Sequence, residues 1–276
     1  MSEVHKSAAM ALDPDAMFLS LKEAVENGNI AMDVERITSA YEYARAAHEG
    51  QLRKDGSPYV THCVAAAQIA LEMGLDEDSI VASLLHDVIE DTSSGYDELS
   101  RLFGATVADL VEGVTKLTRV QYTSKEDEQM ENMRKMLMAM TKDIRVILIK
   151  IADRLHNMRT MEYQTEEKQR SKSLETMEIY APIAHRLGMQ KLKWELEDLS
   201  LKYLDPVGYQ EILDALTAKE TEYKDFMEQI NAQKDSYRAR GVYEVNDRLR
   251  RAMDTLVDGT VPTDNEQQEL YRALLD

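Results

Sequence analysis

A histidine and three acids are clustered in the run HDVIED at residues 86–91. If this run forms one helix at about 100° per residue, the imidazole and the three carboxylates fall within about 140° of one another around the axis. The residues of this polar face are His86, Glu90, Asp87 and Asp91. Such a face can bind a metal ion or move protons, although an ordinary amphipathic helix with a solvated acidic face has the same pattern.

A single acid interrupts a strongly apolar run. Asp153 follows VILIKIA, whose residues favour burial. A carboxylate in that setting is costly unless it is paired or binds a metal. Arg154 is one candidate partner, which would make Asp153 structural. His156 and Asn157 follow within about one helical turn and add polar groups to the same segment.

His62 stands between the loop LRKDGSPY and an expected helix. A lone histidine at a helix start is more often structural than a metal ligand. Together with His86, Asp87 and Asp153, however, it completes a set of two imidazoles and two carboxylates. That set suits a divalent transition metal such as manganese, iron or zinc. A metal with open positions would bind a phosphoryl oxygen and lower the pKa of a bound water.

Charged side chains near these residues fit a phosphate substrate. Glu90 and Asp91, one turn beyond the ligands, are placed to position or deprotonate the water. Arg53 and Lys54 supply the positive charge that an anionic substrate needs on an acidic chain.

Helices are expected to carry most of these residues, while Arg53 and Lys54 lie in the loop. With 11 Gly and 5 Pro among 276 residues, and abundant Ala, Leu, Met, Glu and Lys, the composition is typical of an all-α protein. Asp33 is an expected helix cap, another helix is expected to start near Asp76, and Gly50 and Gly74 are expected helix ends. The expected helices are 34–49, 63–73, 76–91, 126–140, 144–158, 166–187, 189–203 and 207–235. Periodicity alone leaves a strand open for 144–158, and a small hairpin is expected near 118–124.

The charge balance limits the partners. The chain has 33 Lys plus Arg, 51 Asp plus Glu and a formal net charge of −18, which argues against binding a nucleic-acid duplex. One cysteine, Cys63, excludes a disulfide framework and a cysteine-based zinc site. Neither a secretory signal nor a membrane span is evident, so a soluble cytoplasmic protein is expected.

The pattern H…HD…D resembles that of the HD superfamily, and longer motifs resemble one branch of it. YEYARAAHEGQLRKDGSPYVTH, LLHDVIEDT, LVEGVTKLT, ENMRKMLMAMTKDIRVILIKIADRLHNMRT and YAPIAHRLGMQKLKWELEDLSLKYLDP are similar to the hydrolase half of RelA/SpoT homologues. Those enzymes make and destroy the alarmones guanosine tetra- and pentaphosphate. The resemblance covers about residues 33–210, and several long motifs in the right order make it specific.

The resemblance implies an HD-domain helical bundle and a manganese-dependent pyrophosphohydrolase that converts the alarmones to GDP or GTP plus pyrophosphate. By motif position, the metal ligands would be His62, His86, Asp87 and Asp153. Glu90 and Asp91 would orient and activate the water. Arg53, Lys54 and Asn157 would contact the nucleotide, with Arg134 and Tyr180 as weaker candidates. Tyr180 could equally pack on the core, and Arg134 could belong to a surface ion pair.

Two features depart from the family pattern. Cys63 replaces a proline that usually follows the first ligand histidine, which would alter a first helical position; a small packing residue is expected there. The C-terminal part shows no basic synthetase loop. We therefore expect a helical lead-in at 1–32, the HD domain at 33–203, and a helical C-terminal extension at 204–276. That extension could cap the site, mediate a homodimer, or be a solvated appendage.

Other functions fit part of the same pattern. The chain could be an HD phosphohydrolase that acts on deoxynucleotides, on the phosphate of NADPH or on cyclic dinucleotides. The last group usually carries Gly-Tyr-Pro, whereas Gly95 and Tyr96 are followed here by Asp97. A catalytically silent module that binds alarmones is a further alternative, against which the full set of ligands and acids argues.

Overall fold

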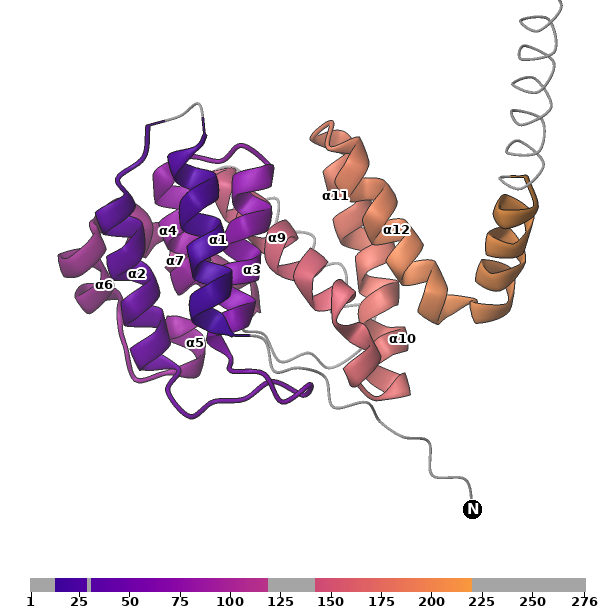
Figure 1. Ribbon diagram of the computed structural model, residues 1–276, viewed down its shortest axis with the longest axis horizontal. Coiled ribbons are helices and arrows are strands. Elements are labelled where there is room, and N and C mark those ends of the chain that lie inside the picture. Colours follow the sequence, from indigo (N-terminus) through magenta and orange to yellow (C-terminus); the bar gives the residue numbers. More distant parts are fainter. Residues whose placement is uncertain (1–12, 29–30, 119–141, 220–276) are drawn as a thin grey trace, which may run out of the picture. The chain divides into compact units, whose positions relative to one another are not determined.

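The computed structural model describes residues 13–28, 31–118 and 142–219, and these are helical with short connections (Figure 1). The helices are α1 (Pro14–Glu26), α2 (Val34–Ala47), α3 (Val60–Glu72), α4 (Glu77–Leu85), α5 (Val88–Asp91), α6 (Tyr96–Phe103), α7 (Ala105–Thr118), α9 (Arg145–Arg159), α10 (Glu166–Glu175), α11 (Ala181–Arg186) and α12 (Gln190–Leu204). The all-α fold predicted from composition is confirmed. No helix in these ranges is long and apolar enough to cross a membrane.

The chain divides into two compact units, Met1–Pro206 and Val207–Asp276. The first unit contains every named helix, and the described part of the second is a helical stretch at 207–219. The helix expected at 126–140, the hairpin beyond residue 118, Arg134, and most of the C-terminal extension lie outside the described residues.

Side-chain caps set where the first helices begin. Asp33 Oδ1 accepts hydrogen bonds from the backbone N–H groups of Glu35 and Arg36, 3.0 and 3.2 Å away. Asp76 Oδ1 accepts from the backbone N–H of Ser79 at 3.1 Å. These bonds satisfy donors that a helix start leaves unpaired, as the sequence predicted for Asp33.

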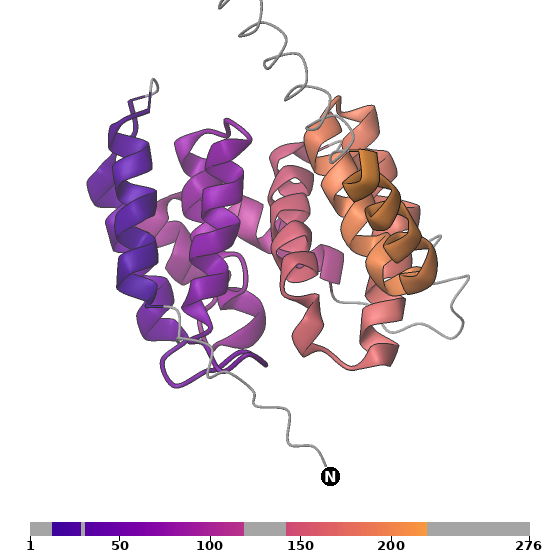
Figure 2. The same ribbon diagram turned by 45° about the vertical axis from the view of Figure 1, so that its right-hand side comes forward.

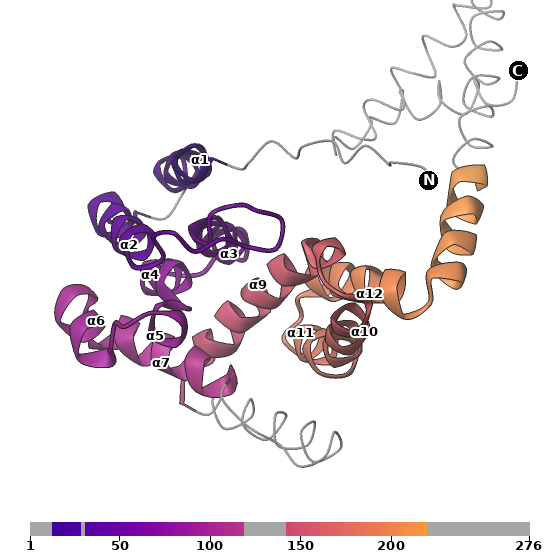
Figure 3. The same ribbon diagram turned by 90° about the horizontal axis from the view of Figure 1, so that it is seen from below.

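The central helix of the first unit is α3, which packs against α1, α4 and α9 (Figure 3). Ten of its residues are buried, among them Val64 and Ala67. On the other side of α9, helices α10, α11 and α12 pack against one another (Figure 2), and α12 also contacts α9. The helix α9 therefore joins two groups of helices, and its buried residues face both.

The expected single helix at 76–91 is interrupted, which corrects the sequence analysis. Helix α4 ends at Leu85, and α5 begins at Val88. Asp87 lies between them, in the right-handed region but with φ −96° and ψ −5°, away from the mean values of a regular α-helix. Its carbonyl accepts from the backbone N–H of Asp91 at 2.8 Å, which starts the next turn. The break brings the side chains of His86 and Asp87 together, whereas an ideal helix would separate them by about 100°.

The later helices follow the expected ranges. Residues 144–158 are helical rather than extended, as α9. The predicted helix at 166–187 is present, but Thr176–Tyr180 forms a π-helical turn between α10 and α11. Such turns insert one residue into a helix and are frequent at functional sites.

A tight turn presents the basic loop. Leu52 and Pro58 form an isolated antiparallel bridge, and the backbone N–H of Arg53 donates to the carbonyl of Ser57 at 2.8 Å. Gly56 has φ +88°, a value that a residue with a Cβ rarely adopts. The turn holds Arg53 and Lys54 next to the start of α3.

Helices α7 and α9 approach closely at Gly113, and Gly113→Ala is expected to destabilise the protein. A Cβ at this position would lie 2.8 Å from Val146 Cγ2, and Val146 is buried and stiff about χ1. Overpacking costs roughly 1–3 kcal/mol, which exceeds the roughly 0.5–1 kcal/mol that alanine gains over glycine in a helix. Chemical denaturation should show a net loss of about 1 kcal/mol. Adding Val146→Ala should relieve the clash, so the double variant should lose less stability than the two single losses added together. A loss in the double variant larger than that sum would contradict this explanation.

Candidate metal and phosphohydrolase site

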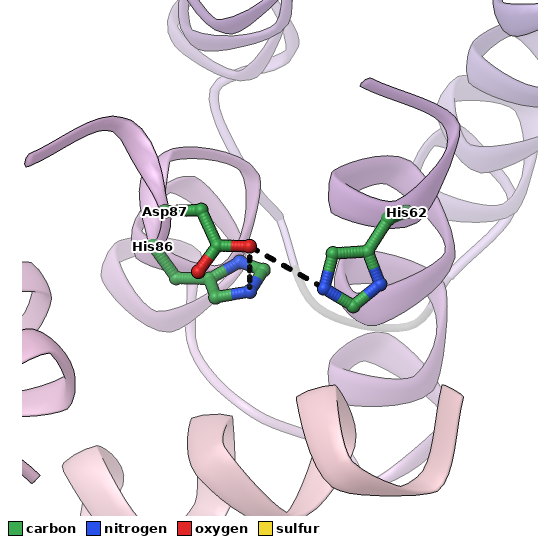
Figure 4. Close-up of side chains that lie close together, drawn as sticks. All are labelled: His62, His86 and Asp87. Carbon is green, nitrogen blue, oxygen red and sulfur yellow. Dashed lines mark ion pairs between the residues drawn. The ribbon is translucent and has the colours of Figure 1, made fainter. Parts of the chain in front are cut away.

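Three side chains from two neighbouring helical segments converge (Figure 4). His62 comes from α3, and His86 and Asp87 come from the junction of α4 and α5. Asp87 Oδ2 lies 3.1 Å from His86 Nε2 and 3.5 Å from His62 Nε2. Their ligand atoms all lie within 4.8 Å of one another, a spacing that suits a shared metal ion.

The fourth predicted ligand, Asp153, comes from α9. Its Oδ1 lies 3.2 Å from His62 Nε2 and 3.8 Å from His86 Nε2. Its Oδ2 accepts from Lys150 Nζ at 2.7 Å. The partner suggested by the sequence, Arg154, instead donates to Glu175 Oε1 and contacts Tyr180. Asp153 thus directs one oxygen to the two imidazoles and the other to a buried lysine.

The histidine ring orientations fit a metal ligand set. His86 Nδ1 lies 2.8 Å from the carbonyl of Ser83, which fixes the ring proton on Nδ1. Nε2 of His86 is buried and makes no hydrogen bond of good geometry, although Asp87 Oδ2 lies 3.1 Å away. A buried ring nitrogen surrounded by two carboxylates and a second imidazole is the arrangement expected of a divalent-cation site. The residues present therefore fit a divalent metal.

The charges of this cluster are strongly coupled. Burial lowers the pKa of His62. Burial also opposes charge on His86, but the carboxylates of Asp87 and Asp153 raise its pKa to about 10. The pKa of Asp153 is held well below its ordinary value, because Lys150 and the two imidazoles outweigh the effect of burial. A cation entering between these donors would replace a proton on His86, so metal and protons compete for the site.

The two acids proposed to activate water lie on α5, directly after Asp87. Glu90 is half-buried and Asp91 is exposed. Tyr59, which the sequence analysis did not single out, donates its hydroxyl to Asp87 Oδ2 at 2.8 Å. Burial, Asp87 and Asp91 together raise the pKa of Tyr59, so this hydroxyl stays protonated as a donor. Its position in the run GSPYVTH gave no sign of this contact.

The basic loop reaches α9. Arg53 Nη2 donates to Asn157 Oδ1 and to Thr160 Oγ1, each at 3.1 Å. Asn157 in turn donates its side-chain amide to Asp153 Oδ1. A chain of contacts therefore links the loop to the candidate metal ligands. Next to it, a small pocket is lined by Arg53, Lys54, Asp55, Thr160, Tyr163 and Gln164.

The remaining predicted residues are placed differently. Tyr180 is buried, and the Arg154 guanidinium lies 4.3 Å from the centre of its ring, so it packs inside the domain as the structural alternative required. Cys63 is fully buried within the first turn of α3. That helix begins at Val60, so Cys63 is its fourth residue and not its first. Burial raises the pKa of the Cys63 thiol, which keeps it a protonated packing residue.

The chain is similar to known proteins over this region. A family model described as the HD domain matches residues 40–190. The bifunctional (p)ppGpp synthase/hydrolase SpoT of Escherichia coli K12 is 47% identical over 214 residues, which cover 78% of this chain and 30% of SpoT. A GTP pyrophosphokinase of Streptomyces antibioticus is 54% identical over 178 residues, covering 64% of this chain and 21% of that protein.

A guanosine-3′,5′-bis(diphosphate) 3′-pyrophosphohydrolase of Haemophilus influenzae is 47% identical over 188 residues, covering 68% of this chain and 28% of that protein. A solved structure titled as a metazoan ortholog of SpoT that hydrolyzes ppGpp is 28% identical, with a TM-score of 0.44 over 64% of this chain and 95% of that one. The chain thus spans less than a third of the length of these curated relatives. With the family model extending over residues 40–190 of 276, the chain belongs to the HD domain family, and SpoT-type alarmone hydrolases are among its homologues.

Proposed function

We propose that this site hydrolyses the 3′-pyrophosphate of guanosine tetra- and pentaphosphate, with manganese as the preferred metal. The observation that carries the proposal is the convergence of His62, His86, Asp87 and Asp153 on one point. The names of the relatives support the substrate, since several are guanosine-3′,5′-bis(diphosphate) 3′-pyrophosphohydrolases. Two imidazoles with two carboxylates suit manganese, and they suit iron or zinc as well.

In the proposed reaction, water adds to the phosphorus bonded to O3′, and the P–O3′ bond breaks. The products are pyrophosphate and GDP or GTP, which regains its 3′-hydroxyl. When bound, the metal supplies Lewis acidity toward a phosphoryl oxygen and lowers the pKa of the attacking water. Glu90 and Asp91 hold and accept the proton of that water. Tyr59 keeps Asp87 in place through its hydroxyl.

The basic loop is proposed to bind the nucleotide. Lys54 lines the small pocket and forms no ion pair with the described residues, so its charge is available for phosphate. Arg53 instead holds Asn157 and Thr160, and it would contact the nucleotide together with Asn157. Catalysis in such a site is mostly positioning and electrostatic stabilisation.

A nucleotide panel tests the substrate. Metal-stripped protein would be given manganese and then guanosine tetraphosphate, deoxynucleoside triphosphates or NADPH in separate reactions. We expect pyrophosphate and GDP from the first alone. Hydrolysis of a deoxynucleotide or NADPH, with the alarmone left intact, would favour the alternative of an HD phosphohydrolase that acts on another nucleotide. Tight binding of the alarmone without any product would favour a silent binding module.

Lys54→Met is expected to raise KM for guanosine tetraphosphate about tenfold with little change in kcat, because loss of one charged contact removes about 1.4 kcal/mol of binding. Steady-state kinetics measures both constants. Lys22→Met, on the exposed face of α1, is the matched control and should leave KM unchanged. A fall in kcat with an unchanged KM would show that Lys54 acts on the chemical step instead.

The domain limits at 33–203 and 204–276 remain proposals, as does the homodimer formed through the C-terminal extension. In the described part of that extension, four apolar side chains are exposed, namely Val207, Ile212, Leu213 and Leu216. Exposed apolar residues at helical spacing support a packing role for this stretch.

A further inference from the structure

We propose that His156 is a positioning residue, which fixes the ring of His62 in the one tautomer that can bind a metal. The proposal rests on the metal site proposed above. His156 lies on α9, three residues after Asp153 and one before Asn157. The sequence analysis treated it only as one of the polar groups of this segment.

The contact between the two histidines is short and part-buried. His62 Nδ1 lies 2.7 Å from His156 Nδ1. The ring centres are 4.9 Å apart, and the ring planes are inclined by 40°. His62 is 1% exposed, so water does not supply another partner for this nitrogen. At this distance, one nitrogen donates a hydrogen and the other accepts it.

The two possible tautomers have opposite consequences for the metal. A neutral imidazole carries one N–H. If His62 carries it on Nδ1, its Nε2 has a free lone pair directed at Asp87 and Asp153. If His156 donates instead, His62 must carry its hydrogen on Nε2 and cannot bind a metal there. The metal-binding form therefore requires His156 Nδ1 to be the acceptor and His156 Nε2 to carry the hydrogen.

The position of His156 on α9 gives this contact a second effect. The same helix carries Asp153, whose Oδ1 lies 3.2 Å from His62 Nε2. Thus α9 supplies a metal-binding carboxylate on one side of the His62 ring and the hydrogen-bond acceptor on the other. Partners of this kind orient metal-binding histidines in proteins, and their loss typically costs roughly 10- to 100-fold in metal affinity.

Two variants of similar shape separate the acceptor from mere packing. His156→Asn retains an oxygen acceptor near the position of Nδ1, whereas His156→Leu has the same number of side-chain heavy atoms and no acceptor. Manganese binding to the metal-stripped full chain would be measured by titration with detection of free Mn²⁺ by electron paramagnetic resonance. We expect the Leu variant to bind roughly 10- to 100-fold more weakly than wild type, and the Asn variant to recover most of that loss.

Equal affinities in wild type and the Leu variant would overturn the proposal, and so would an equal loss in both variants, since that would reflect packing alone. A wild-type chain that binds no manganese would reject the metal site itself, which is a separate failure. Where the Leu variant does not fold, ¹⁵N spectra of the histidine rings in zinc-loaded wild type give the same test. We expect a hydrogen on Nδ1 of His62 and on Nε2 of His156; the reverse assignment would overturn the proposal.

Discussion

Asp153→Asn should lower the rate of guanosine tetraphosphate hydrolysis by more than about 100-fold, because loss of an outer partner of a metal ligand already costs roughly 10- to 100-fold. The substitution keeps the size of the side chain and removes its charge. Asp153 Oδ1 faces both imidazoles, and Oδ2 faces Lys150, so an amide cannot satisfy both sides. The expected result is a matched loss of metal affinity and of turnover.

Two controls separate this effect from unfolding. Asp153→Asn leaves Lys150 buried without its counter-charge, so thermal unfolding of the variant must be measured alongside activity. Asp87→Asn removes a proposed ligand whose close contacts are with His62, His86 and Tyr59, and it should lose activity with a smaller effect on stability. Asp97→Asn, exposed at the start of α6, should change neither property. Activity retained in both ligand variants would contradict the proposed metal site.

Glu175→Leu should destabilise the protein by about 3 kcal/mol, because it breaks a buried ion pair. This value is at the low end of the usual range, since the Glu175 side chain is 22% exposed. Arg154 is 6% exposed, and its Nη2 lies 2.8 Å from Glu175 Oε1. Without Glu175, the guanidinium keeps its contacts with the neutral Tyr180 hydroxyl and ring but loses the carboxylate that bonds to it directly. Because this pair joins α9 to α10, its loss should also loosen the helix that carries Asp153.

Chemical denaturation of a small series checks this prediction. The double variant Arg154→Met with Glu175→Leu should be more stable than Glu175→Leu alone, because it removes the unpaired charge. A single variant within about 0.5 kcal/mol of wild type would show that the pair contributes little.

The same pair has a defined pH dependence. Burial raises the pKa of Glu175, but the opposite effect of Arg154 and Lys172 is larger. The folded-state pKa therefore lies below the ordinary value of 4.5. A carboxyl group with a depressed pKa stabilises the folded state above its unfolded pKa, and that stabilisation is lost as pH falls through the folded pKa. The difference in unfolding free energy between wild type and Glu175→Leu should therefore be constant near neutrality and shrink below about pH 4.5.

Local signals in the sequence predicted the helices well. Asp33 caps the helix that it was expected to cap, because a short acceptor side chain before an apolar period has few other uses. The helix expected to start near Asp76 begins at Glu77. The break after Leu85 was not predicted, since HDVIED has no glycine or proline and every residue in it tolerates a helix. The break depends on contacts with residues from α3 and α9, which a local pattern does not contain.

The same limit applies to the site. The four proposed metal ligands could be grouped from their types and from the cost of burying Asp153. The residues that contact these four side chains could not be predicted from the sequence. They are Tyr59, Lys150 and His156, and each is compatible with an ordinary structural role. Their contacts join residues 28 and 94 positions apart in two cases, and only the fold brings those residues together. Lys150 lies one turn from Asp153, yet the adjacent Arg154 was the more obvious partner.

Product analysis of the metal-stripped chain tests the central claim most directly. The protein would be incubated with guanosine tetraphosphate, with and without added manganese, and the nucleotides and pyrophosphate would be separated by ion exchange. The account predicts GDP and pyrophosphate in equal amounts, only when manganese is present. Equal turnover without any divalent metal, or products other than these two, would contradict it.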